Sequence, residues 1–419
     1  MAPVARNIEA EVRDVLTSSR VGAILGPRQA GKSTLAIDLQ KGGLLPDYYT
    51  LDREPIRAAA LEDPDGFMAG IGKPAVIDEI QRAPDLMLAI KVVVDRDDSP
   101  GQFLITGSAD LRTLRAVADA LPGRVIYVNL WPFSQGEIEG RRERLIDQLL
   151  AGQPPHLSDE PTGRPAHAER VVRGGFPNAY RQTDRQRSRY FESYVGDVLE
   201  RDLPIDVDIR AGAEKPGQLL RLLAARSGNL ANFTTLADQL ELDGKTVKAH
   251  VALLEELFLV YRLRPWSRNL RTRHVKTPKL LLTDTGMMSA LIGADAARYS
   301  AIDQGELAGM LLETFVTMEL VKQQTWADAR VQLFFYRDKE QREVDVVMES
   351  VTGDVAGVEV KAAASVGRTD TRGLRFLRDK LGDRFKAGIV LYTGSATLPI
   401  GDRIWAVPLR GLWAGGEAP

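Results

Sequence analysis

Residues 26–34 read GPRQAGKST, and this stretch decides the fold of the first third of the chain. It matches the pattern GxxxxGK[ST], in which glycines let backbone N–H groups wrap closely around phosphate. The apolar run VGAIL before it predicts a buried strand, and the residues after it predict a helix whose N-terminus faces the anion. The motif therefore predicts a nucleotide site formed by Gly26, Pro27, Arg28, Gln29, Ala30, Gly31, Lys32, Ser33 and Thr34.

Two acidic residues at the end of a second apolar run complete this site. We expect Lys32 to reach the outer phosphates and the Ser33 hydroxyl to ligate Mg²⁺. Asp78, the last residue but one of the run AVIDE, is predicted to hold the same Mg²⁺. Glu79 is then placed to polarise the attacking water, a general-base role that binding alone would not need. Together the two motifs predict ATP hydrolysis with ATP and Mg²⁺ as the ligands.

Four apolar runs, at residues 21–25, 74–80, 102–107 and 124–130, show no polar alternation. Such runs are typical of parallel strands that helices cover on both faces, so we predict an α/β fold of the P-loop NTPase type. The third run ends in hydroxyls beside the expected γ-phosphate. Ser108 is the better placed to sense that phosphate, Thr106 is the second candidate, and a Ser/Thr turn before a helix is the alternative.

The bulk composition predicts a folded protein of two or three domains. The chain has 419 residues, 44% of them hydrophobic, and its 55 Lys and Arg nearly cancel its 57 Asp and Glu, so net charge does not indicate nucleic acid. Cysteine is absent, which excludes disulfides and thiol catalysis. Neither a signal peptide nor a run of about 20 apolar residues is visible, so we expect a cytoplasmic protein that does not enter a membrane.

A helix-turn-helix pattern follows in the middle of the chain. Residues 233–240 predict a supporting helix, and residues 245–257 predict a second helix that Asp243 caps. A strand and a basic run, 262–279, come next, and together they predict a winged helix that binds the phosphate backbone of DNA or RNA. The candidate contacts are Lys245, Lys248, Arg268, Arg271 and Arg273, with His250 as a further possibility. The alternatives are a protein-interaction module and a solvated charged face.

The last third carries an acidic pattern on strands. Glu359 and Lys361 share one face of a predicted strand, and Asp345 lies in the strand before it. Two carboxylates and a lysine suit Mg²⁺ and a metal-bound water, which predicts a candidate nuclease site. Glu313, in a predicted helix, is a fourth member, although Glu319 lies nearer the apolar stripe of that helix. A charged pair on a solvated strand face is the alternative.

The motifs GPRQAGKST, VIDEIQ, FLITGSAD and LPGRV resemble those of bacterial and archaeal AAA-type ATPases whose second half is a poorly understood C-terminal domain. GGFPNAY, ERDL, TPKLLLTDTGMMSALIG and EVKAAAS are similar to that half, except that Asn178 stands where an acidic residue is expected. The resemblance implies that Arg124 stabilises charge on the transferring phosphoryl, often from a neighbouring subunit; an unpaired surface arginine is the alternative. Asp345, Glu359 and Lys361 also match the PD-(D/E)xK restriction-endonuclease-like signature, and Glu313 resembles a helix glutamate of some branches.

We therefore expect a P-loop ATPase domain at 1–135, a helical lid and linker at 136–214, a winged-helix-like domain at 215–283 and a restriction-endonuclease-like domain at 284–419. One hypothesis is that the nucleotide state controls DNA binding or processing by the C-terminal half. Another is a signalling or assembly ATPase whose C-terminal half docks a protein without nuclease activity. A homo-oligomer is compatible with both. A purely structural role for ATP would give Glu79 no use.

Overall fold

The computed structural model describes residues 4–108, 122–155, 157, 164–202, 214–267 and 277–415. The chain divides into two compact units. The N-terminal unit comprises Arg6–Pro132 with Glu256–Phe258, and the C-terminal unit comprises Phe133–Glu255 and Leu259–Pro419 with Met1–Ala5. No helix of the described residues is both long enough and apolar enough to cross a membrane.

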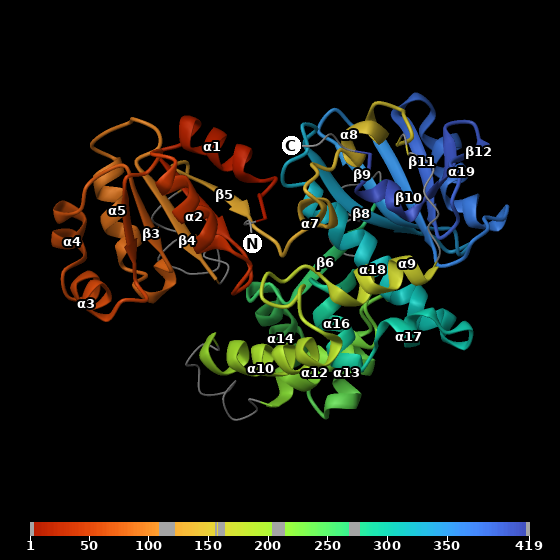
Figure 1. Ribbon diagram of the computed structural model, residues 1–419, viewed down its shortest axis with the longest axis horizontal. Helices are drawn as coiled ribbons and strands as arrows, with labels where there is room; N and C mark the ends of the chain where they lie inside the picture. Colours follow the sequence, from red (N-terminus) through yellow and green to blue (C-terminus); the bar gives the residue numbers. More distant parts are fainter. Residues whose placement is uncertain are drawn as a thin grey trace. The chain divides into compact units, whose positions relative to one another are not determined.

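A five-stranded parallel sheet forms the centre of the N-terminal unit (Figure 1). Its order is β2-β3-β4-β1-β5, and neighbouring strands are all parallel. The strands are β1 (Val21–Leu25), β2 (Asp47–Thr50), β3 (Ala75–Asp78), β4 (Phe103–Gly107) and β5 (Val125–Asn129). β1, β3 and β4 are buried along their whole length, as the unbroken apolar runs predicted.

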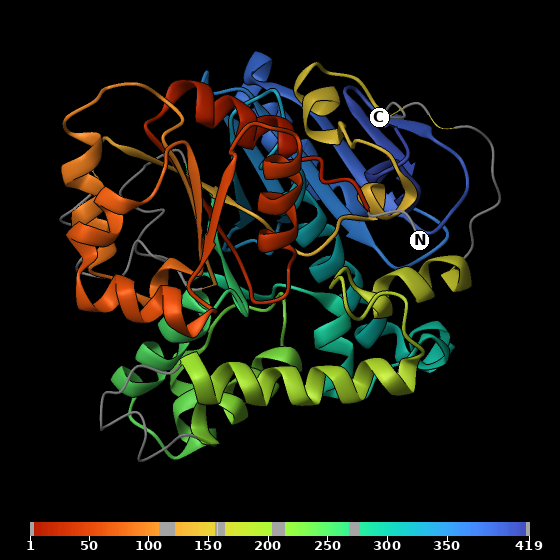
Figure 2. The same cartoon turned by 60° about the vertical axis from the view of Figure 1, so that its left-hand side comes forward.

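Helices lie on both faces of this sheet. They are α1 (Glu9–Ser18), α2 (Lys32–Lys41), α3 (Glu54–Glu62), α4 (Pro64–Gly70), the 3₁₀ turn η1 (Ile80–Arg82) and α5 (Leu86–Val94). The crossover through α2 runs from β1 outward to β2, whereas those through α3–α5 run back towards β4. Because such crossovers are right-handed, opposite directions place their helices on opposite faces (Figures 1 and 2). The predicted α/β parallel sheet is confirmed.

An eight-stranded mixed sheet forms the core of the C-terminal unit, in the order β12-β13-β11-β10-β9-β8-β6-β7. Its strands are β6 (Val260–Pro265), β7 (Lys279–Leu282), β8 (Val331–Arg337), β9 (Glu343–Ser350), β10 (Val355–Lys361), β11 (Phe385–Tyr392), β12 (Leu398–Gly401) and β13 (Ile404–Pro408). β8, β9 and β10 are antiparallel, whereas β10, β11 and β13 are parallel. The β6–β7 hairpin extends the same sheet through β8, so the expected boundary at 283/284 does not separate two compact bodies.

The helices of this unit come from both the middle and the end of the chain. They are α7 (Gln135–Glu139), α8 (Leu145–Leu150), α9 (Arg164–Arg173), α10 (Asp184–Asp202), α12 (Glu214–Ala224), α13 (Phe233–Leu240), α14 (Gly244–Glu256), α16 (Thr285–Ile292), α17 (Ala296–Ser300), α18 (Gly305–Gln323) and α19 (Arg372–Leu381). Short 3₁₀ turns lie at Ile302–Gln304, Thr369–Thr371, Gly382–Arg384 and Leu409–Leu412.

The region expected to form a helical lid belongs to the C-terminal unit. α9 and α10 pack against α16, and α9 also packs against α17 (Figure 2). These contacts bury apolar side chains such as Val171 and Phe191 within the C-terminal unit. Helices α8 and α9 also lie within the expected lid and linker region, 136–214, and both belong to the C-terminal unit.

The segments GGFPNAY and TDTGMMS are joined by a buried carboxylate. Asp284 caps α16 by accepting from the Met287 N–H at 3.0 Å, and its second oxygen accepts from the Gly175 N–H at 2.7 Å. A Cβ on Gly174 would lie 2.2 Å from the same carboxylate, so only glycine fits this approach. These motifs therefore hold α16 to the turn before α10, while Asn178 is exposed.

Candidate active site

The phosphate-binding loop connects β1 to α2 and depends on two glycines. A Cβ on Gly26 would lie 2.0 Å from the Leu130 carbonyl oxygen, so the chain after β5 requires glycine there. Gly31 has φ +102° and directly precedes α2. Lys32 is buried and folds back over the loop, donating to the carbonyl oxygens of Gly26 at 3.0 Å and Pro27 at 2.9 Å. The ammonium is thus held within the loop that the motif predicted.

A buried carboxylate ringed by hydroxyls lies beside this loop. The Asp78 oxygens accept from Ser33 at 2.9 and 3.0 Å, from Tyr48 at 2.8 Å and from Thr106 at 2.5 Å. Burial, and then the Asp78 charge, raise the pKa of Tyr48 above its ordinary value, so its hydroxyl stays a donor. The Ser33 and Asp78 oxygens are the hard ligands that Mg²⁺ prefers, so the pair fits the predicted metal.

Glu79 lies next to Asp78 but has different partners. Its backbone is left-handed, with φ +61°, and its N–H donates to Thr106 at 3.1 Å. Its carboxylate accepts from Ser108 at 3.2 Å and from Gln81, which also donates to Ser108 at 2.8 Å. The two hydroxyls therefore have different partners: Thr106, in β4, positions Asp78, and Ser108, directly after β4, lies at Glu79.

Tyr48 and Gln81 were missed in the sequence. Tyr48 lies in β2, a short edge strand whose residues DYYT are all half-buried and carry no apolar run. Gln81 follows Glu79 by two positions, and the only available signal was its place in VIDEIQ. Arg6 also reaches the loop, donating to the Ala30 carbonyl oxygen at 3.2 Å and to that of Trp131 at 2.5 Å.

Arg124 lies at the opposite edge of the sheet from the phosphate-binding loop. It directly precedes β5, and its carbonyl accepts from the Val21 N–H at the start of β1. The loop follows the other end of β1, five residues or roughly 16 Å away. Arg124 forms a two-point ion pair with Asp95, at 2.5 and 2.9 Å, and this pair lowers the pKa of Asp95. In this structure Arg124 therefore does not reach the loop of its own chain.

The helix-turn-helix pattern is present as α13, a turn and α14. Asp243 caps α14 as predicted, accepting from the N–H groups of Lys245 at 2.8 Å and Thr246 at 3.0 Å. Lys245 and Lys248 are exposed on α14, and the Lys248 ammonium lies 5.7 Å from the centre of the Phe233 ring. His250 is buried, and burial lowers its pKa, so the expectation that it faces a ligand is wrong.

The basic run after α14 is less available than its sequence indicated. Arg262 forms a two-point pair with Glu255, at 2.6 and 2.5 Å, and Lys279 is buried among carboxylates. Trp266 is buried in the sheet core, where it packs against Tyr336. Arg268, Arg271 and Arg273 lie outside the described residues.

Three of the predicted nuclease residues meet in the C-terminal unit, around a lysine that was not predicted. The Lys279 ammonium lies 2.7 Å from Glu313, 2.8 Å from Glu343 and 3.6 Å from Asp345. Asp345 also accepts from the Val360 N–H at 2.9 Å, which brings β9 and β10 together beside Glu359. We call Lys279, Glu313, Glu343, Asp345 and Glu359 the acidic centre.

The two remaining predictions for this centre are resolved by the structure. Lys361 is directed to Asp370, at 2.7 Å, and not to the carboxylates. Glu319 is buried elsewhere, between Lys322 at 2.6 Å and the Gln135 N–H at 2.8 Å, so Glu313 is the glutamate of α18 that faces the centre. A helical wheel could not decide this, because α18 is buried on most of its surface.

Burial shapes the protonation of the acidic centre. Burial, and then Asp345, raise the pKa of Glu313 to about 8 and that of Glu359 well above its usual range. Burial alone would lower the pKa of Lys279, but Glu313, Asp345 and Glu343 raise it. One oxygen of Glu359 is buried without a hydrogen-bond partner. The centre thus holds more carboxylates than cations.

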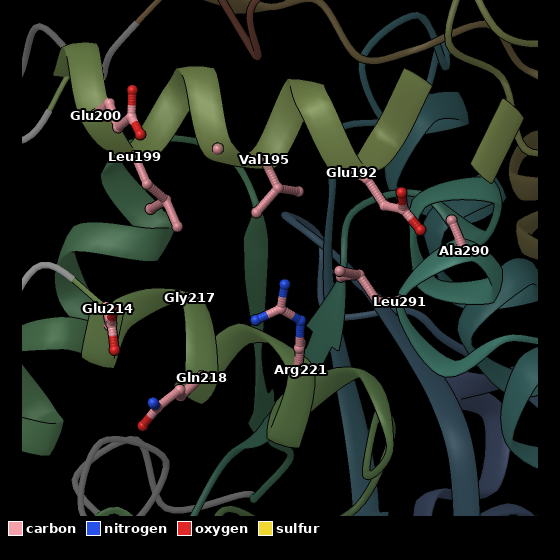
Figure 3. A pocket seen from close by; sticks show the side chains of 11 residues that line it. Glu192, Val195, Leu199, Glu200, Glu214, Gly217, Gln218, Arg221, Ala290 and Leu291 are labelled. Carbon is pink, nitrogen blue, oxygen red and sulfur yellow. The ribbon is translucent and has the colours of Figure 1, made fainter. Parts of the chain in front are cut away.

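A separate groove of about 530 Å³ lies between α10 and α12 (Figure 3). Its apolar lining includes Val195, Leu199 and Leu291, and Arg221 projects into it from α12 (Figure 3). None of the predicted site residues lines it. Two motifs, ERDL and TPKLLLTDTGMMSALIG, contribute Glu200 and Leu291 to its lining, but neither predicted a groove.

Comparison with known proteins places the chain in a family. Residues 18–139 match the model of the AAA domain, and residues 164–298 and 308–412 match two domains of unknown function, DUF8612 and DUF4143. Over 407 residues the chain is 30% identical to uncharacterized protein Rv2008c of Mycobacterium tuberculosis and to uncharacterized protein Mb2031c of Mycobacterium bovis. The match covers 96% of this chain and 83% of each relative. The chain belongs to their family. Its N-terminal unit is an AAA-type P-loop ATPase domain.

Solved structures give weaker likenesses. The Walker-type ATPase PABY2304 of Pyrococcus abyssi matches with a TM-score of 0.43 and 13% identity, over 70% of this chain and 99% of that chain. AMPPCP-bound DnaA from Aquifex aeolicus matches with a TM-score of 0.25 and 16% identity, over 59% and 86% of the two chains.

Proposed function

We propose that the AAA domain binds ATP with Mg²⁺ and hydrolyses it. The observation that carries this proposal is the hydrogen-bonded pair of Ser33 and Asp78 directly beside the phosphate-binding loop. The Ser33 hydroxyl and the Asp78 carboxylate would hold Mg²⁺, which neutralises phosphate charge when bound. Lys32 would exchange its two carbonyl partners for phosphate oxygens, which are stronger acceptors because they are charged.

In this proposal Glu79 orients and polarises the attacking water. Its carboxylate is half-buried at the end of β3, and its partners are the neutral side chains of Gln81 and Ser108. In these contacts the Glu79 carboxylate forms no ion pair with a cation, which suits a group that must accept a proton. Ser108, beside it, would sense the γ-phosphate, while Thr106 keeps Asp78 in place.

Two substitutions separate binding from hydrolysis. Lys32→Ala should abolish ATP binding, measured by the fluorescence of a labelled ATP analogue, because a charged contact to phosphate is lost. Glu79→Gln keeps the size of the side chain and should bind ATP as wild type does, while turnover falls roughly 10²–10⁴-fold. Unchanged affinity in the first variant would overturn the site, and unchanged turnover in the second would place the base elsewhere.

We propose that Arg124 acts on the ATP of a neighbouring chain in a homo-oligomer. Its position at the far end of β1 from the phosphate-binding loop supports this direction. Arg124→Ala and Lys32→Ala should each be inactive alone. Mixing them should restore part of the turnover, because some interfaces pair an intact loop with an intact arginine. A mixture that stays inactive would argue against this role.

For the C-terminal unit we propose that the nucleotide state controls DNA binding or processing. Two exposed lysines on the capped helix α14 support backbone contact, and the β6–β7 hairpin follows them as in a winged helix. Lys245→Ala and Lys248→Ala should weaken binding of duplex DNA and reduce its dependence on salt concentration. If wild type shows no DNA binding at low salt, protein docking without nuclease activity becomes the preferred function of this unit.

A further inference from the structure

Lys279 is the cation at the middle of the acidic centre. Lys279 is the first residue of β7, and it pairs with Leu263 of β6. This pairing fixes the position of its backbone. Its side chain is buried, and its ammonium lies 5.3 Å from the centre of the Phe335 ring. Because the aliphatic part of the side chain is buried, the ammonium can move away from the carboxylates only if the whole side chain changes conformation.

Three carboxylates surround the Lys279 ammonium, and two of them lie within hydrogen-bonding distance. An ammonium has three N–H groups, and three carboxylates, from Glu313, Glu343 and Asp345, lie at 2.7, 2.8 and 3.6 Å. Asp345 spends its other oxygen on the Val360 N–H. These are the oxygens that a metal ion would need, because Mg²⁺ requires about six oxygen ligands in octahedral geometry.

One oxygen of Glu359 is also buried there and has no hydrogen-bond partner. A divalent ion at this place would have to displace the ammonium, because one oxygen each of Glu313, Glu343 and Asp345 already lies against it. Among the described residues, no group of three or more Asp, Glu and His side chains is arranged as a set of metal ligands. The donors are instead arranged around an ammonium.

We infer that Lys279 is a built-in counter-ion that occupies the cation position of the acidic centre. The wild-type centre therefore takes no divalent metal ion. Lys361 cannot replace Lys279 here, because its ammonium pairs with Asp370. The proposed ATP hydrolysis belongs to the other unit and does not depend on this counter-ion.

Binding of Mn²⁺, followed by the electron paramagnetic resonance of the free ion, tests the inference without nucleotide. The full chain is used with Asp78→Asn, so that the phosphate-binding loop does not contribute. This protein should bind no stoichiometric Mn²⁺, and adding Lys279→Met should create one site per chain. Adding Asp345→Asn as well should remove that site, while Lys361→Met, the matched lysine change, should create none.

Two results would overturn the inference. One is a stoichiometric Mn²⁺ site that exists with Lys279 intact and is lost on Asp345→Asn. The other is a folded Lys279→Met protein that gains no Mn²⁺ site. If Lys279→Met does not fold, as circular dichroism would show, the comparison of the Asp78→Asn protein with and without Asp345→Asn decides alone.

Discussion

Asp78 and the acidic centre are both buried carboxylate sites, and they differ in what surrounds the charge. At Asp78 three hydroxyls, from Ser33, Tyr48 and Thr106, donate to one carboxylate. In the acidic centre one ammonium donates to several carboxylates. A hydroxyl can rotate and offer a lone pair to an incoming metal, whereas an ammonium has no acceptor and must be expelled. The hydroxyls at Asp78 therefore allow Mg²⁺ to bind, whereas the Lys279 ammonium takes its place in the acidic centre.

The largest effect that tests this difference is expected from a change at Asp78. Asp78→Asn removes the charge that holds Mg²⁺ but keeps the size of the side chain, so Mg²⁺-dependent ATP turnover should fall on the order of 10²-fold or more. ATP affinity measured without Mg²⁺ should change little. Turnover assays over a series of Mg²⁺ concentrations check this, and wild-type turnover in the variant would refute the assignment.

Removal of the built-in cation should be costly for stability. Lys279→Ala leaves buried carboxylates without their counter-ion, and such losses destabilise by about 3–5 kcal/mol. Lys361→Ala breaks a partly exposed pair, with the Lys361 side chain 43% exposed, and should cost about 0–1 kcal/mol. Denaturant unfolding of both variants measures the difference. Equal losses would mean that Lys279 is not the central ion of the cluster.

Buried carboxylates without enough neighbouring cations retain protons, so the stability of the protein should depend on pH. Burial, and then Glu319, raise the pKa of Glu143 to about 8. The pKa of Glu143 in the folded protein lies above its value in the unfolded chain. Its contribution to the free energy of unfolding is therefore complete below about pH 4.5. That contribution is lost as pH rises towards 8, by up to about 1.4 kcal/mol per pH unit. Glu143→Gln should flatten this decline in unfolding experiments from pH 5 to 8. The exposed change Glu169→Gln should leave the profile as in wild type, and an unaltered slope in Glu143→Gln would contradict the account.

The smallest effect concerns one hydroxyl of the Asp78 ring. Tyr48→Phe removes a hydrogen bond to a buried charge and should cost about 1–2 kcal/mol of unfolding free energy. The neighbouring change Tyr49→Phe serves as the control, since that ring packs edge-on against Phe67. Equal stability of the two variants would show that Tyr48 does not support Asp78.

Much of the fold of the N-terminal unit could be predicted, because short contiguous segments of the sequence specify its strands and its phosphate-binding loop. Contiguous apolar runs specify β1, β3 and β4, and the loop from Gly26 to Ser33 carries its own geometry. The edge strand β2 escaped prediction because a half-buried strand needs no apolar run, and Tyr48 was lost with it.

The acidic centre depends on residues that are distant in the sequence. Asp345 and Glu359 could be paired through alternation on neighbouring strands. Lys279 comes from a hairpin 66 residues upstream of Asp345, and its charge looked like part of a basic surface. The contacts of its ammonium with Glu313 and Glu343 show that this lysine points into the unit. Burial, which decides the role of a charge, is not a local property of the sequence.

The number of Mn²⁺ ions bound per wild-type chain, with and without a non-hydrolysable ATP analogue, tests the account most directly. We predict one ion in the presence of the analogue, held at Ser33 and Asp78, and none in its absence. A chain that binds Mn²⁺ equally well without nucleotide, or none with it, would contradict the account.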